Sequence, residues 1–291
     1  MLWHPFFIFP YLFFSNDADN IFTNMIWEND MKNKFLSFLL LFSVLLNLFS
    51  NVASADENVC SWYIKRNGNE RPRFPQEAED LSDFNCYYID DTASKNSEKI
   101  LYLTFDAGYE NGNISKILDV LKEEDVPAAF FVLDNIILKN TDLVTRMADE
   151  GHLVCNHTKN HRNLSRATKE DISSDLGALE KIYYEKTGRE MSRFFRFPEG
   201  KYSLEATKTV CELGYTTVFW SFGYEDWDNG KQMPKEKAMK KILDNTHDGA
   251  IILLHPTSAT NAEIMSTLIT RWKEMGYKFG TLYELVERSK K

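Results

Sequence analysis

From residue 100 onward the chain alternates between two hydrophobic patterns. Short apolar runs, typical of buried strands, precede segments whose apolar residues recur at helical spacing. Ile100–Phe105 predicts a strand and Ile114–Glu124 an amphipathic helix. The same patterns predict further strands at 128–133, 152–155, 193–197, 216–220, 250–254 and 277–279, and helices at 143–150, within 165–187, and at 204–213, 234–246, 261–275 and 281–288. Seven strands alternating with helices are typical of parallel strands joined by helical crossovers.

This alternation is compatible with an open doubly wound sheet or with a barrel, and both belong to the α/β class. No G-x-G-x-x-G segment and no phosphate-loop lysine follows a strand, so we expect no nucleotide cofactor. The formal net charge of −9 gives no electrostatic basis for binding nucleic acid. We expect a monomer.

The segment before the alternating part has the pattern of an export signal. Lys32 and Lys34 precede an uncharged stretch, 35–49, and small residues follow at 53–55. This order predicts a signal peptide over 31–55 and an extracytoplasmic, secreted or cell-wall-associated protein. An uncleaved anchor in the membrane is the alternative. Because residues 1–30 precede a complete signal, we interpret Met31 as the true start.

Residues 56–98 lack a clear period, so we expect an irregular lead-in before a catalytic domain at 99–288. The chain has four cysteines. Cys60 and Cys86 could pair outside the cell. Cys155 and Cys211 lie in apolar stretches and are expected to be buried thiols.

Polar residues with catalytic potential follow several of the predicted strands. They are Asp106, His157 and His161, Arg196 at a strand end, Asp226, and His255. The carboxyl ends of parallel strands meet at one edge, where active sites form in α/β proteins. Any one of these residues alone could be a helix cap or a solvated turn residue. Their convergence at one edge predicts an active site.

Five short segments resemble, in order, the motifs of the polysaccharide deacetylases, carbohydrate esterase family four. They are TFDAG at 104–108, HTKNH at 157–161, RFPEG at 196–200, EDW at 225–227 and LLH at 253–255. The YENG sequence at 109–112 is similar to the delta-lactam biosynthetic de-N-acetylases of spore-forming bacteria. The resemblance implies a distorted (β/α) barrel with about seven parallel strands.

The resemblance also implies a role for each candidate residue. Asp106 would be the general base, oriented by Arg196, and His255 the general acid, supported by Asp226. His157 and His161 would hold a divalent metal ion, expected to be zinc. The substrate would be the N-acetyl groups of peptidoglycan glycan strands, most directly those of N-acetylmuramic acid.

Ala107 departs from the family pattern, which places a second aspartate there as a third metal ligand. A methyl group cannot ligate, so we expect the metal to be weakly held. We also expect an aspartate at position 107 to project toward His157 and His161. A second departure is Gly223, where the wider family often has an aspartate. Two alternatives stay open: a deacetylase of N-acetylglucosamine or chitooligosaccharides, and a non-catalytic glycan-binding relic.

Overall fold

The computed structural model describes residues 59–290, which contain one eight-stranded, all-parallel sheet. Its order is β11-β5-β6-β7-β8-β10-β4, with β12 also paired to β5. The strands are β4 (Cys86–Tyr87), β5 (Ile100–Ala107), β6 (Ala128–Val132), β7 (Leu153–Asn156), β8 (Ser192–Phe195), β10 (Thr216–Val218), β11 (Ala250–Leu254) and β12 (Lys278–Phe279). All seven predicted strands are therefore confirmed, and β4 is an eighth.

The two ends of this sheet approach each other, which makes it a distorted barrel as predicted. Phe222, beyond the end of β10, forms a parallel bridge with Ile252 of β11. Ile89, just after β4, forms an antiparallel bridge with Ala250. These single bridges replace a full ladder between the end strands, so the closure is irregular.

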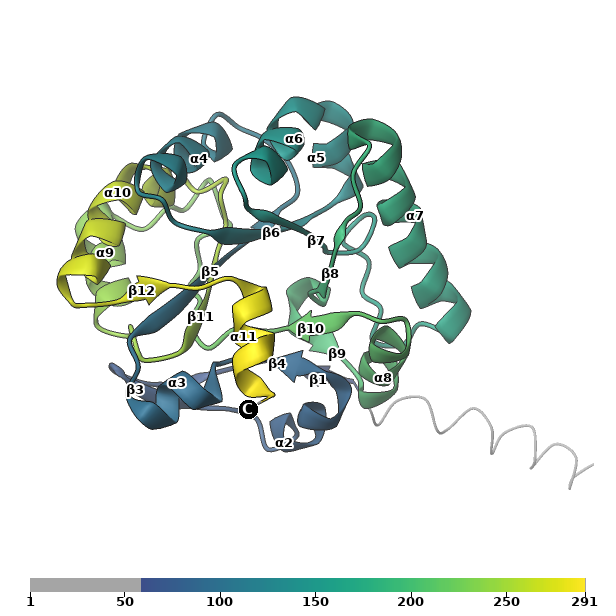
Figure 1. Cartoon of the computed structure of the whole chain (residues 1–291), viewed down its shortest axis with the longest axis horizontal. Helices are drawn as coiled ribbons and strands as arrows, with labels where there is room; N and C mark the ends of the chain where they lie inside the picture. Colours follow the sequence, from purple (N-terminus) through teal and green to yellow (C-terminus); the bar gives the residue numbers. More distant parts are fainter. Residues whose placement is uncertain (1–58, 291) are drawn as a thin grey trace, which may run out of the picture. The chain divides into compact units, whose positions relative to one another are not determined.

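Helices α4 (Ile114–Glu123), α5 (Asp134–Lys139), α6 (Thr141–Asp149), α7 (Lys169–Thr187), α8 (Leu204–Glu212), α9 (Lys235–Leu243) and α10 (Ala259–Glu274) lie around the outside of the sheet (Figure 1). Helix α11 (Leu282–Ser289) does not belong to this outer ring. The predicted helices are confirmed, with small shifts at their ends. The longest begins at Lys169, where Thr168 caps it by accepting a hydrogen bond from the amide of Asp171. Helix α5 was not predicted.

Strand β5 separates two apolar layers because its side chains alternate between its faces. Leu103, Phe105 and Ala107 pack in the outer cluster, which also holds buried residues of α4 and α10. Tyr102 faces the inner cluster, together with Leu282 and Leu285 of α11. Helix α11 therefore packs against the apolar interior of the barrel (Figure 1).

The expectation that residues up to 98 form only an irregular lead-in is wrong for the described part. This part contains β1 (Cys60–Ser61), β2 (Lys65–Asn67), β3 (Glu70–Arg73), α2 (Ala78–Leu81), a 3₁₀ turn η1 (Ser82–Phe84), β4 and α3 (Asp91–Asn96). Strand β1 pairs with β9 (Lys201–Tyr202), and Trp62 stacks on Phe219 with ring centroids 4.6 Å apart. These contacts and β4 join the segment to the barrel, so no domain boundary separates it at residue 99.

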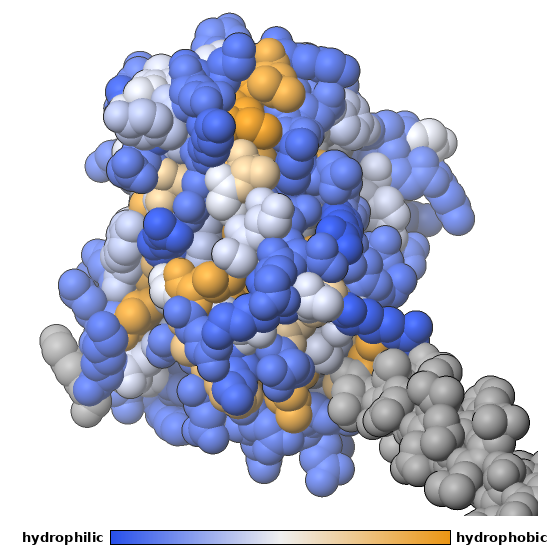
Figure 2. Space-filling view, turned by 90° about the vertical axis from the view of Figure 1, so that its right-hand side faces the viewer, coloured by the Kyte–Doolittle hydropathy of each residue, from blue (hydrophilic) through white to orange (hydrophobic). Residues whose placement is uncertain are grey.

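All four cysteines are free thiols, so Cys60 and Cys86 form no disulfide here. Cys155 is buried as expected, whereas Cys211 is only half-buried. Residues 1–30 and the predicted signal over 31–55 lie outside the described residues. Among residues 59–290, no helix combines the length and the apolar character that a membrane span needs. Hydrophilic residues predominate on the face in Figure 2, and apolar residues form small separate patches there.

Candidate active site

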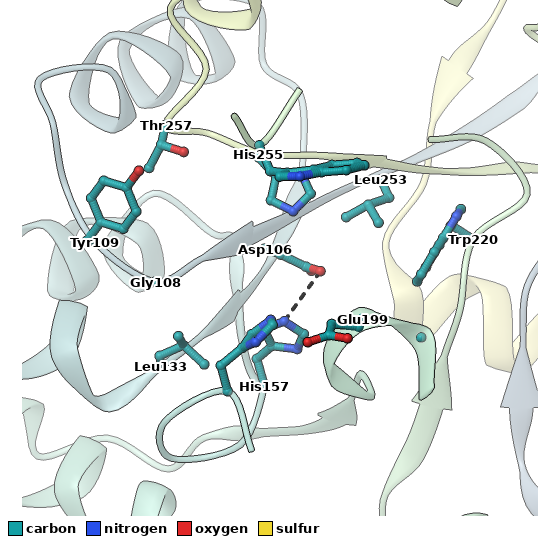
Figure 3. A pocket seen from close by; sticks show the side chains of 13 residues that line it. Asp106, Gly108, Tyr109, Leu133, His157, Glu199, Trp220, Leu253, His255 and Thr257 are labelled. Carbon is teal, nitrogen blue, oxygen red and sulfur yellow. Dashed lines mark ion pairs between the residues drawn. The ribbon is translucent and has the colours of Figure 1, made fainter. Parts of the chain in front are cut away.

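A cavity of about 620 Å³ opens at the carboxyl ends of the strands and holds four of the six predicted site residues. Asp106, His157 and His255 line it (Figure 3), and so does His161. The other two, Arg196 and Asp226, are almost wholly buried behind it, where each contacts one of the lining residues. The structure therefore brings all six together.

Asp106 is held by a fully buried arginine. Arg196 Nη1 donates to Asp106 Oδ1 at 2.8 Å, while its Nη2 donates to the Thr104 hydroxyl at 2.8 Å. The remaining donors reach backbone carbonyls of the strand-end segment 218–219. The guanidinium also lies 4.2 Å from the ring centroid of Phe131. Since its side chain is 0% exposed and each of its three nitrogens donates a hydrogen bond, Arg196 is a fixed cation beneath the carboxylate.

Two opposing effects act on the pKa of Asp106. Burial raises it, but the charge of Arg196 and then those of His157 and His255 outweigh burial and lower the pKa. The side chain remains 11% exposed, on the cavity side. Asp106 is therefore an ionised carboxylate that a molecule in the cavity can reach.

His157 is oriented as a neutral imidazole with one nitrogen toward the cavity. Its Nδ1 lies 2.9 Å from the carbonyl oxygen of Arg196, a contact that requires the proton on Nδ1. Its Nε2 lies 3.5 Å from Asp106 Oδ2 (Figure 3). Burial lowers the pKa of His157 to about 4, although Asp106 acts in the opposite direction. The Nε2 lone pair is consequently free at neutral pH.

The turn after β7 brings His161 to the same place. Thr158 and His161 both have positive φ, at 69° and 61°, which is costly for residues other than glycine. Asn156 accepts from the Thr158 amide and Asp175 from the Lys159 amide, and these bonds hold the turn. The imidazoles of His157 and His161 then lie with ring centroids 5.1 Å apart.

The donor set fits a divalent ion that has two protein ligands. Neutral imidazoles suit such ions, and a histidine whose Nδ1–H binds a carbonyl is oriented as metal-ligating histidines usually are. Within residues 59–290, no three His, Cys, Asp or Glu side chains are grouped to hold a metal. Ala107 does not line the cavity: its side chain is fully buried in the outer apolar cluster.

Across the cavity, His255 is paired with Asp226. His255 Nδ1 lies 2.7 Å from Asp226 Oδ1, and the His255 amide donates to Oδ2 at 2.8 Å. Burial lowers the pKa of His255, but the hydrogen bond and charge of Asp226 outweigh it, so the pKa is raised. With Nδ1 engaged, Nε2 is the nitrogen available for proton transfer.

Several residues near the site were not identified from the sequence as site residues. Thr104 accepts a hydrogen bond from Arg196. Asn261 Nδ2 donates to Asp226 Oδ2 at 2.6 Å. Thr104 lies two positions before Asp106 on a buried strand, so the two side chains share one face of that strand. This spacing could have shown that Thr104 lies beside Asp106. Trp220 and Leu253 form apolar parts of the cavity wall.

Gly200 shapes the wall of the cavity near Glu199. It has φ of +64°, and an added Cβ would lie 2.9 Å from the Trp220 ring and 3.0 Å from Trp62 Cβ. Glu199, which also lines the cavity, has φ of +56°. The RFPEG segment therefore requires glycine at its end for both conformational and steric reasons.

Comparison with known proteins agrees with this architecture. The family model for polysaccharide deacetylase matches residues 93–218. The peptidoglycan-N-acetylmuramic acid deacetylase PdaA of Bacillus subtilis is 36% identical over 230 residues, covering 78% of this chain and 85% of PdaA. The solved structure of PdaA, a family 4 carbohydrate esterase, superposes with a TM-score of 0.75 at 35% identity, covering 79% of this chain and 98% of that one.

Two more distant relatives differ in activity. The peptidoglycan-N-acetylglucosamine deacetylase PgdA of Listeria monocytogenes is 32% identical over 189 residues, 65% of this chain and 39% of PgdA. A CE4 family pseudoenzyme from Bacillus anthracis has a TM-score of 0.59 at 28% identity, over 64% of this chain and 65% of that one. Activity thus has to be argued from the site residues, whereas the fold, the match and the identity to PdaA establish the family: the chain belongs to the polysaccharide deacetylases, carbohydrate esterase family four.

Proposed function

We propose that this protein removes N-acetyl groups from peptidoglycan, acting on N-acetylmuramic acid. The observation that carries the proposal is the placement of Asp106 and His255 in one cavity, each with its own charged partner. The substrate class follows from the similarity to PdaA, of which this chain covers 85%.

The geometry supports a hydrolysis in two proton transfers. Asp106 accepts a proton from a water molecule as its oxygen attacks the acetyl carbonyl carbon. When the carbon–nitrogen bond breaks, the proton on His255 Nε2 passes to the leaving nitrogen, so acetate and a free amine are released. Arg196 keeps Asp106 ionised and Asp226 stabilises the imidazolium form of His255.

We also propose that His157 and His161 hold a divalent ion, for which zinc is the first candidate. When bound there, such an ion supplies electrophilic polarisation of the carbonyl and lowers the pKa of a water molecule. Two imidazoles without a carboxylate predict weak binding, so the protein should purify largely metal-free.

The alternative of a glycan-binding relic is favoured by Ala107, which cannot ligate a metal. A binding protein, however, has no need for an ionised base, a buried cation beneath it and a paired acid. The intact set of Asp106, Arg196, Asp226 and His255 favours an enzyme.

Mass spectrometry of peptidoglycan fragments treated with the purified protein tests the proposal, with and without added divalent metal. Loss of the mass of an acetyl group from muramic acid residues is expected, and Asp106→Asn is the matched control. Loss from glucosamine residues instead would show an N-acetylglucosamine deacetylase. No loss from either sugar with any metal would favour the relic.

We further propose export across the cytoplasmic membrane through the signal over 31–55, with the deacetylated product serving muramic delta-lactam formation in the spore cortex. Intact-mass analysis of the exported protein tests the first step. A mature chain that retains residues 1–30 would contradict it. Muropeptide analysis of spores that lack the protein tests the second, since delta-lactam should be missing.

A further inference from the structure

A second cavity, of about 320 Å³, adjoins the catalytic one. Trp220, Trp227, Leu253 and His255 line both cavities, so the two adjoin around the proposed acid. The lining of the second cavity also contains Arg66 of strand β2 and Lys241 of helix α9. Neither residue belongs to the six residues of the catalytic site.

Arg66 is an exposed residue that contacts the cavity wall and keeps donors free for a ligand. Its Nη2 donates to the carbonyl of Gly223, and its guanidinium carbon lies 5.4 Å from the ring centroid of Phe222. A guanidinium has five N–H donors on three nitrogens, and the Gly223 carbonyl accepts from only one of these nitrogens. The contact also ties strand β2 to the segment that leads to Asp226.

Lys241 is a half-buried cation without a side-chain partner among residues 59–290. Its neighbour Lys240 differs, because it points to solvent and lies 2.6 Å from Asp244 Oδ2. The cavity wall also contains Glu225, whose charge acts on Arg66, so two cations and one carboxylate line this cavity in a chain whose net charge is −9. The local excess of positive charge calls for an anionic ligand.

We propose that Arg66 and Lys241 form a subsite that binds a carboxylate of the substrate. The inference rests on the proposed function. It concerns the residues by which the protein would distinguish muramic acid from N-acetylglucosamine. Muramic acid bears a lactyl ether on the carbon next to the acetamido carbon, so its carboxyl group is only a few bonds from the nitrogen that His255 protonates. A stem peptide attached to the lactyl group turns that carboxylate into a neutral amide but brings carboxylates of its own.

N-acetylglucosamine has a hydroxyl group in place of the lactyl ether and offers the subsite no charge. An arginine and a lysine together can bind both oxygens of a carboxylate. The subsite would thus favour muramic acid through binding, without taking part in the chemistry. Its removal should raise KM and leave kcat nearly unchanged.

The test measures KM and kcat for the wild-type protein and for Arg66→Gln and Lys241→Gln. The matched controls are Lys65→Gln, beside Arg66 on β2, and Lys240→Gln, beside Lys241 on α9. Three substrates are compared: peptide-free muramic glycan strands, strands with stem peptides, and neutral chitooligosaccharides. Each subsite variant is expected to raise KM about tenfold or more, the loss typical of a hydrogen bond to a charged group. The controls and the neutral substrate should be unaffected.

The substrates separate the two carboxylate sources. An effect confined to peptide-free strands assigns the lactyl carboxylate, and an effect confined to peptide-bearing strands assigns a carboxylate of the stem. Unchanged KM values on both, with wild-type turnover intact, would overturn the subsite while leaving the proposed function in place. Absence of wild-type turnover on both muramic substrates would overturn the proposed function and the subsite with it.

Discussion

The guanidinium of Arg196 lies 2.8 Å from the carboxylate of Asp106, and the arginine side chain has no solvent exposure. The cation is therefore part of the barrel interior, fixed by Thr104 and by backbone carbonyls before any substrate arrives. A general base that is ionised without a bound substrate needs such a partner, because burial alone would protonate it.

We predict that Asp106→Asn abolishes deacetylation and also lowers the melting temperature. The amide keeps the shape of the carboxylate but cannot accept the water's proton, so the rate should fall by about 10²–10⁴-fold or more. Removing one partner of a buried ion pair leaves Arg196 uncompensated, at a cost of about 3–5 kcal/mol. Kinetics and thermal melting measure the two effects.

The control for this change is Asp119→Asn, which removes the exposed partner of Arg146. A pair of this kind is worth less than about 1 kcal/mol, so melting temperature and rate should barely change. Wild-type activity in Asp106→Asn would refute the assignment of the base.

The pairing of His255 with Asp226 predicts a pH dependence. The acid must be protonated, and its pKa is raised, so the rate should fall as pH rises through that raised value. Asp226→Asn removes the charge that raises the pKa and should move this falling limb to lower pH. A pH–rate profile of both proteins measures the shift.

His255→Ala provides the comparison, because it removes the acid altogether. We expect its kcat to fall about 10²–10⁴-fold with little change in KM. A raised KM with unchanged kcat would reassign His255 to substrate binding. A falling limb that Asp226→Asn leaves in place would assign that limb to another group.

The resemblance to the family implied the barrel, which the hydrophobic period alone left open beside a doubly wound sheet. The period predicted the alternating strands and helices, because most of them are long enough to show it. It missed β4 and α5 because two and six residues show no reliable period. The pairing of β4 with β10 joins residues more than a hundred positions apart, and only the folded chain determines it.

Strand ends were enough to predict which side chains share the active-site edge. The contacts that orient them were less accessible. Asn261, which donates to Asp226, comes from a helix whose position depends on tertiary packing. The expectation that a side chain at position 107 projects toward His157 and His161 is wrong for Ala107. Alternation along β5 places the side chains of Asp106 and Ala107 on opposite faces, and Ala107 packs outward.

This packing gives Ala107→Asp two expected effects. A carboxylate in the apolar cluster is costly unless it is paired or coordinated, so the melting temperature without metal should fall. If the strand end lets the carboxylate turn to His157 and His161, divalent metal should restore the melting temperature and bind more tightly than to wild type. Melting curves with and without zinc, and calorimetric titration, measure both.

Ala107→Asn is the matched control, since an amide is a weaker ligand without the charge. The same metal response in wild type and in Ala107→Asp would show that position 107 does not reach the metal. The effect on turnover is a separate measurement, because tighter metal binding does not by itself stabilise the transition state.

The last prediction concerns a histidine outside the site. His152 is 5% exposed, and neither ring nitrogen has a hydrogen-bond partner among the described residues. Burial lowers its pKa to about 4, so the folded protein favours the neutral ring. An unfolded chain protonates this histidine near its ordinary pKa of about 6.5. Its contribution to stability is thus fully present above that value and is lost as pH falls toward 4.

The shift corresponds to about 3 kcal/mol of unfolding free energy across that range. We expect urea denaturation at several pH values to show this loss. His152→Phe keeps a ring of similar shape beside Phe130, whose ring centroid is 5.6 Å from that of His152, and cannot be protonated. The variant should therefore lose less stability than wild type between pH 6.5 and 4. Equal losses in the two proteins would mean that His152 is solvated or partnered in solution and that other groups cause the acid sensitivity.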